Sequence, residues 1–164
     1  YYGPKEEDDL PDLSLKTFVA SVRNLKWKNV EALKNIFNKE DSKIPQNTKL
    51  VTIGYDINSF LSKIKGSYAF ILVSLGDISP NTILDAIHYN KPFICTKEVG
   101  IYDRIKDAGI FVDPLNPNEI EKAILNLLDE KEYEKAKKKV KDFTFTHTWE
   151  EIAKEFMNVY KNIK

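Results

Sequence analysis

The feature that most constrains this chain is a continuous apolar run, YAFILVSL, at residues 68–75. A run of this kind is typical of a strand that helices cover on both faces, as in a parallel sheet. Shorter apolar runs at 16–21, 49–54, 92–96 and 109–113 alternate with segments of helical period. The sequence therefore predicts an α/β fold with a doubly wound, mostly parallel, Rossmann-like sheet and helices on both faces.

The predicted helical segments show apolar residues at helical spacing, and some also have capping residues at their starts. The clearest begins after Asn116, with Pro117 at the first helical position and Glu119 three residues past the cap. A last helix is expected from Thr148, and Trp149 is interpreted as its core anchor. The predicted helices span 29–37, 57–66, 79–90, 100–108, 116–128 and 129–143, followed by the helix from Thr148.

Length and charge narrow the classes of function. The 164 residues suffice for one sizeable core, and we expect an acidic arm at 1–14 and one domain at 15–164. Lys plus Arg and Asp plus Glu both number 25, so the chain has no general attraction for nucleic acid or anionic membrane. A single cysteine, Cys95, excludes an internal disulfide and suits the cytoplasm, and we expect it to be a buried apolar residue. Because the chain opens on Tyr1, we expect a processed chain or a piece of a longer one.

Two strand ends carry the candidate chemistry, since open α/β sheets bind ligands beyond the carboxyl ends of their strands. After residues 68–75, Ser79 is predicted as an N-cap and Pro80 as the first helical residue, and a helix start can hold a phosphate. After residues 16–21 come Arg23 and Lys28, which could neutralise a diphosphate. Most helix starts bind nothing and most loop cations are solvated, so either feature alone leaves a structural role open. Together they predict a two-sided diphosphate clamp.

The same residues form a recognisable series of motifs. Ser74 precedes Asp77, and Asp85 follows Asp77 after seven intervening residues and leads into AIHYNKPFICTKEVG. Lys28 stands five positions after Arg23, within WKNVEAL at the start of a predicted helix, and FTHTWEEIAKEFMNVYKNI lies near the end of the chain. In their order and spacing these motifs resemble the nucleotide-sugar-binding, C-terminal half of retaining glycosyltransferases of the GT-B fold. The family is the large one often numbered four, also called glycosyl transferases group 1, and the resemblance runs from about Leu15 to the C-terminus.

The resemblance implies roles for these residues. Arg23, Lys28 and Asp77 would be catalytic: the two cations stabilise the departing nucleoside diphosphate, and the carboxylate contacts donor-sugar hydroxyls. The remaining donor contacts would be Asp85 to the ribose, the helix start at Ser79, Pro80, Asn81 and Thr82 to the phosphates, and Gly54 and Tyr55 to the base. No metal or cofactor is implied, because the nucleoside-diphosphate sugar is the substrate.

The sequence also departs from the family. Asp77 and Asp85 stand where the family has glutamates, Ser21 replaces a glycine, and residues 38–48 are too few for a βα unit that the family has. The N-terminal acceptor-binding half is not in the chain, so we expect donor binding without efficient transfer. The expected setting is glycan or polysaccharide synthesis in the cytoplasm, with peripheral association of the full enzyme at the cytoplasmic face of a membrane.

Two other functions stay open from the sequence. A non-catalytic nucleotide-sugar-binding or regulatory module of the same fold is the alternative that the two aspartates favour. A plain α/β interaction domain without a ligand is the other. The closing helix adds an expectation of its own: its stripe of Trp149, Ile152, Phe156 and Tyr160 is predicted to leave an apolar patch in the isolated chain.

Overall fold

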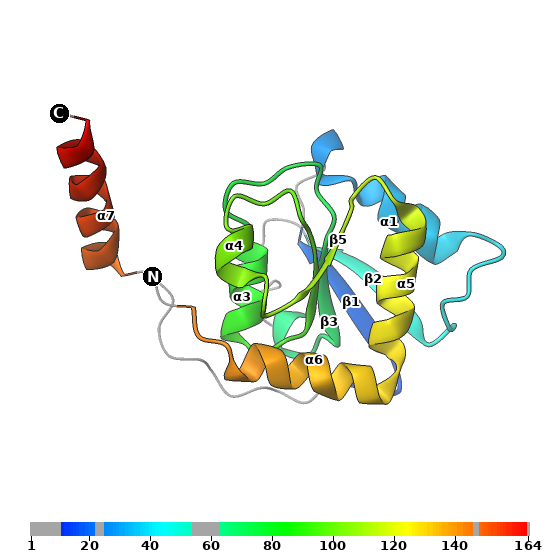
Figure 1. Cartoon of the computed structure of the whole chain (residues 1–164). Helices are drawn as coiled ribbons and strands as arrows, with labels where there is room; N and C mark the ends of the chain where they lie inside the picture. Colours follow the sequence, from blue (N-terminus) through cyan, green and yellow to red (C-terminus); the bar gives the residue numbers. More distant parts are fainter. Residues whose placement is uncertain (1–10, 22–24, 54–62, 146–147, 164) are drawn as a thin grey trace.

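The computed structural model describes residues 11–21, 25–53, 63–145 and 148–163 (Figure 1). These residues form a parallel sheet with the strand order β2-β1-β3-β4-β5. The predicted doubly wound α/β fold is confirmed. The strands are β1 (Lys16–Ser21), β2 (Thr48–Ile53), β3 (Ala69–Leu72), β4 (Phe93–Thr96) and β5 (Ile110–Val112).

Helices cover both faces of the sheet. In Figure 1, α1 and α5 lie on one face, α3 and α4 lie on the other, and α6 crosses one end of the sheet. The described helices are the 3₁₀ turn η1 (Lys26–Lys28), α1 (Val30–Asn38), α3 (Asn81–His88), α4 (Tyr102–Ile105), α5 (Pro117–Leu128), α6 (Glu130–Asp142) and α7 (Trp149–Asn162).

The central position of β3 explains its unbroken apolar sequence. Phe70 and Leu72 point into the core under α3, whereas Ala69 and Ile71 point into the core under α1 and α5. All four are essentially inaccessible to solvent. Successive side chains of a strand point to opposite faces, so a strand covered on both faces needs apolar residues at every position.

The winding of the chain creates a switch point between β1 and β3. From β1 the chain passes through α1 to β2 on one side, and it then returns to place β3 on the other side of β1. Between α1 and β2, residues 39–47 form turns without a helix or strand, so the family's extra βα unit is absent there. In open sheets of this type the carboxyl edge at the switch point is where ligands bind.

The helix caps confirm one prediction and correct another. Asn116 caps α5, because its side chain accepts a hydrogen bond from the Glu119 N–H, and Pro117 is the first helical residue. The predicted cap at Ser79 is wrong: Pro80 occupies the N-cap position, and α3 begins at Asn81. The Pro80 backbone has an extended ψ of 91°, and its carbonyl accepts from the first bonded amides of the helix, so the helix starts one residue later than predicted.

Helix α7 projects from the body of the protein (Figure 1). Thr148 caps it in a reciprocal capping box with Glu151, and Glu155 pairs with Arg104 on α4 at 2.9 Å. Trp149 is 73% exposed, so its interpretation as a core anchor is wrong. Of the predicted apolar stripe, Trp149, Phe156 and Tyr160 are exposed and Ile152 is half-buried. Met157, Val159 and Ile163 are also exposed. None of the described helices has both the length and the apolarity needed to cross a lipid bilayer.

Candidate functional site

Lys28 and Asp77 meet at the switch point. Lys28 is the last residue of η1, which follows β1, and Asp77 follows β3. The Lys28 Nζ lies 2.5 Å from the Asp77 Oδ2, and the two side chains are 18% and 14% exposed. A backbone hydrogen bond of 2.7 Å from the Leu75 N–H to the Trp27 carbonyl joins the same two segments. The two strand ends therefore come together through a largely buried ion pair.

The backbone of Asp77 is held from both sides by the loop after β4. Its N–H donates to the Glu98 carbonyl at 2.9 Å, and its carbonyl accepts from the Gly100 N–H at 2.8 Å, as in a short parallel bridge with Val99. Sequence reasoning missed Gly100, although a glycine between a strand and a short helix is a signal of close backbone approach. These contacts fix the point from which the Asp77 carboxylate projects.

Ser74 adds a buried hydroxyl at the same strand end. Its side chain is fully buried, and its Oγ has no hydrogen-bond partner in the described part of the chain. A buried hydroxyl without a partner costs stability, so native proteins seldom keep one without a use. It lies three residues before Asp77, in the segment that leads from β3 to the ion pair.

The start of α3 lies at this edge with a mixed set of side chains. Pro80 is buried and has no N–H, so it contributes packing and cannot donate to a phosphate as the sequence analysis expected. Ser79 and Asn81 are exposed, whereas Thr82 and Asp85 are half-buried. Because α3 starts at Asn81, Asp85 lies about 6 Å further along the helix axis.

Three predicted site residues, Arg23, Gly54 and Tyr55, lie outside the described residues. The second cation of the clamp and the base-binding loop therefore stay predictions. The described part of the clamp consists of Lys28 and the start of α3, and Asp77 lies beside Lys28.

Cys95 lies beneath this edge on β4 and is fully buried, as predicted. Burial, together with the nearby Asp77 charge, raises the pKa of the thiol to about 12. The thiol is therefore protonated at physiological pH and is a structural residue rather than a nucleophile.

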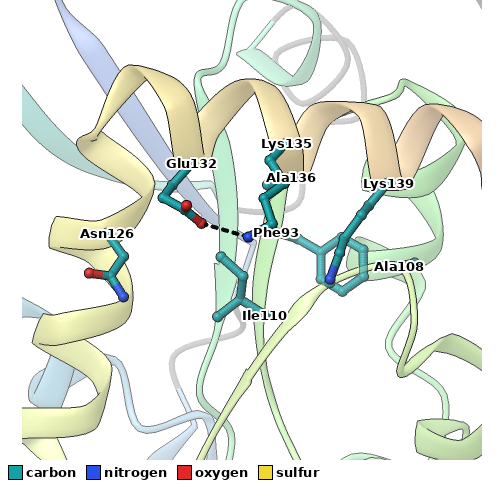
Figure 2. Close-up of a pocket in the computed structure, with 9 residues that line it drawn as sticks. Phe93, Ala108, Ile110, Asn126, Glu132, Lys135, Ala136 and Lys139 are labelled. Atoms are coloured by element: carbon teal, nitrogen blue, oxygen red, sulfur yellow. Dashed lines mark hydrogen bonds and ion pairs between the residues drawn. The ribbon is translucent and has the colours of Figure 1, made fainter.

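A cavity of about 170 Å³ (Figure 2) is lined by none of the predicted site residues. Phe93 and Ile110, at the beginnings of β4 and β5, line it from the sheet, and α6 covers it. Its polar rim includes Glu132 and Lys135, an exposed ion pair at 3.4 Å. The cavity is thus at the amino edge of the sheet, whereas Lys28 and Asp77 are at the carboxyl edge.

Solved structures that share this fold include the following three. Sucrose-phosphate synthase from Thermosynechococcus elongatus aligns with a TM-score of 0.64 at 13% identity, over 93% of this chain and 46% of its own. The chain therefore shares the Rossmann-like α/β fold of part of this protein. The catalytic domain of starch synthase IV from Arabidopsis thaliana, bound to ADP and acarbose, aligns with a TM-score of 0.67 at 16% identity. The alignment covers 91% of this chain and 38% of the starch synthase chain. A glycosyltransferase from Rickettsia africae aligns with a TM-score of 0.61 at 16% identity, and the alignment covers 91% of this chain and 48% of that protein's chain.

At these identities the likeness concerns the fold, and the chain spans less than half the length of each of these proteins. No protein-family model matches the chain, and the curated proteins give no match either.

Proposed function

We propose that the chain is the donor-binding half of a glycosyltransferase that takes a sugar from a nucleoside-diphosphate sugar. The observation that carries the proposal is the meeting of Lys28 and Asp77 beside the start of α3, at the switch point of the sheet. Ligands of open α/β sheets bind at this point, and the fold is shared with three glycosyltransferases.

The chemistry follows from the charges. The Lys28 ammonium, together with Arg23, stabilises the negative charge that develops on the departing nucleoside diphosphate. The positive end of the α3 dipole adds to this stabilisation. With cationic side chains in this role the transfer needs no metal ion, and the proposed outcome is retention at the anomeric carbon.

The carboxylates of Asp77 and Asp85 bind different parts of the donor in this proposal. Asp77 accepts hydrogen bonds from hydroxyls of the donor sugar, and Asp85, on the second turn of α3, accepts from the ribose. Each is one methylene shorter than the glutamate of the resembling family. This shorter reach also favours the alternative that the module binds a nucleotide sugar without transferring it.

The proposed partner is an acceptor-binding half. The chain spans 38% to 48% of the three similar structures, and the apolar face of α7 is exposed at Trp149 and Phe156. We propose that this face packs against the acceptor-binding half, whether that half belongs to the same polypeptide or to another. The proposed process is glycan or polysaccharide synthesis at the cytoplasmic face of a membrane.

Calorimetric titration with ADP, UDP and GDP tests the proposal. The wild type should bind at least one of them, and Lys28→Ala should weaken that binding about tenfold or more, since a charge-assisted contact contributes about 1.5–3 kcal/mol. Lys39→Ala is the matched control, because Lys39 also sits in an ion pair, with Glu121 at 3.0 Å, and not at the switch point. A folded wild type that binds none of the three at millimolar concentration contradicts the proposal.

A further inference from the structure

The ion pair gives Lys28 an anionic partner within the protein itself. Its two charged groups are 2.5 Å apart, and each side chain is more than four-fifths buried. Charges at this depth are screened by salt less than charges on the surface. An anion that binds Lys28 must therefore compete with the Asp77 carboxylate.

The backbone contacts of Asp77 limit how far its carboxylate can move away from Lys28. Its N–H and its carbonyl are both hydrogen-bonded to residues 98–100, so its Cα stays in place while only the side-chain torsions are free. The Asp77 charge also acts on Cys95, since after burial it contributes to the raised pKa of that thiol. When an anion binds the Lys28 ammonium, the largely buried Asp77 carboxylate is left without its cation.

A largely buried carboxylate that loses its cation carries an energetic penalty. A bare anion leaves that penalty in place. A ligand with hydroxyl groups beside its anionic group offsets it, because the anion binds Lys28 while the hydroxyls donate to Asp77.

We infer that Asp77 is a specificity-determining residue that opposes bare diphosphates and favours diphosphates carrying a polyhydroxylated group. The inference rests on the proposed function, in which Lys28 binds the donor diphosphate. In this arrangement both ligands separate Lys28 from Asp77, but only the nucleotide sugar supplies hydroxyl groups that donate to the Asp77 carboxylate. The site therefore favours the nucleotide sugar over the free nucleoside diphosphate.

The test compares wild type with Asp77→Asn, which keeps the shape of the side chain and removes its charge. Binding of inorganic pyrophosphate and of ADP and UDP is measured by calorimetry. Loss of the competing charge should tighten the binding of pyrophosphate about threefold to tenfold, because the Lys28 ammonium then has no anionic partner to give up. The advantage of UDP-glucose over UDP, or of ADP-glucose over ADP, should shrink by a similar factor.

Glu121→Gln is the matched control. It also removes one negative charge from a partly buried ion pair, the one with Lys39, and should leave pyrophosphate binding unchanged. Lys28→Gln combined with Asp77→Asn should abolish the gain, because the gain requires the freed ammonium. Thermal unfolding checks that each variant is folded, and Asp77→Ser replaces Asp77→Asn if the amide does not fold.

The outcomes separate this inference from the proposed function. If the wild type binds diphosphates and Asp77→Asn binds them equally or more weakly, the specificity role is overturned and the donor site stands. If Glu121→Gln tightens binding as much as Asp77→Asn, the effect is one of net charge, and the specificity role is again overturned. If no folded variant binds pyrophosphate, nucleoside diphosphate or nucleotide sugar, the proposed function falls, and the inference falls with it.

Discussion

Gly100 passes so close to Ile78 that a side chain has no room between them. A Cβ at Gly100 would lie 2.6 Å from the Ile78 carbonyl oxygen. This contact joins the loops after β3 and β4, and it brings the Gly100 N–H to the Asp77 carbonyl. The geometry of the proposed site therefore depends on a residue that contributes no side chain to it.

Gly100→Ala should separate these loops and lower the free energy of unfolding by about 1–3 kcal/mol, as overpacking against backbone usually does. Gly76→Ala is its control, because nothing lies within 4 Å of a Cβ there and the backbone has no positive φ. Urea unfolding should show Gly76→Ala as stable as the wild type or more stable by up to about 1 kcal/mol, because alanine restricts the unfolded chain. Equal stability of the two variants would contradict the close contact.

Ser74 and Ser67 are both fully buried but differ in their partners. The Ser67 Oγ donates to the Ile64 carbonyl at 2.7 Å, whereas the Ser74 Oγ has no partner in the described residues. Ser67→Ala should therefore destabilise the protein by about 1 kcal/mol, and Ser74→Ala should be neutral or stabilising. The two midpoints of denaturant unfolding check this, and a large loss at Ser74 would reveal a hydrogen bond of its hydroxyl.

Asp85 is expected to distinguish nucleotides from bare phosphates. Asp85→Ala should weaken binding of a nucleoside diphosphate more than binding of inorganic pyrophosphate, because its proposed partner is the ribose. Parallel titrations of both ligands measure the ratio of their Kd values. A ratio unchanged from that of the wild type would place the ribose elsewhere.

The exposed face of α7 should make the isolated chain self-associate at high concentration, since an uncovered apolar patch favours association. Phe156→Glu places a charge in the centre of this face and should shift the protein towards monomer in sedimentation equilibrium. Asn158→Glu is the control for the added negative charge, because Asn158 is an exposed, uncharged polar residue of the same helix. A wild type that stays monomeric throughout would contradict the expectation.

Cys95 should be unreactive in the folded protein. Its thiol pKa is raised to about 12, so the reactive thiolate is scarce at pH 8, and the side chain is fully buried. A disulfide reagent should modify it only after unfolding in urea. Since the folded pKa lies above the unfolded value, the protonated thiol favours the folded state, and this contribution is lost as the pH rises from about 9 towards 12. Rapid labelling of the native protein at pH 8 would contradict its burial.

Local sequence predicted the elements of this fold. The run at 68–75 indicated a strand covered on both faces, and β3 is the central strand of the sheet. Asn116 and Glu119 indicated the start of α5 because a helix cap is formed by residues within one turn. The alternation of strands and helices then indicated the carboxyl edge as the place for the candidate site.

Partners distant in the sequence were decided only by the tertiary structure. Sequence analysis singled out Lys28 and Asp77 but gave each a ligand, whereas the fold pairs them with each other across 49 positions. It expected Trp149 in a core, but the periodicity of a helix shows only that one face is apolar and not what covers it. Helix caps and the periodicity of apolar residues depend on residues within about one helical turn of each other. Ion pairs and burial depend on which strand ends and surfaces the whole chain brings together.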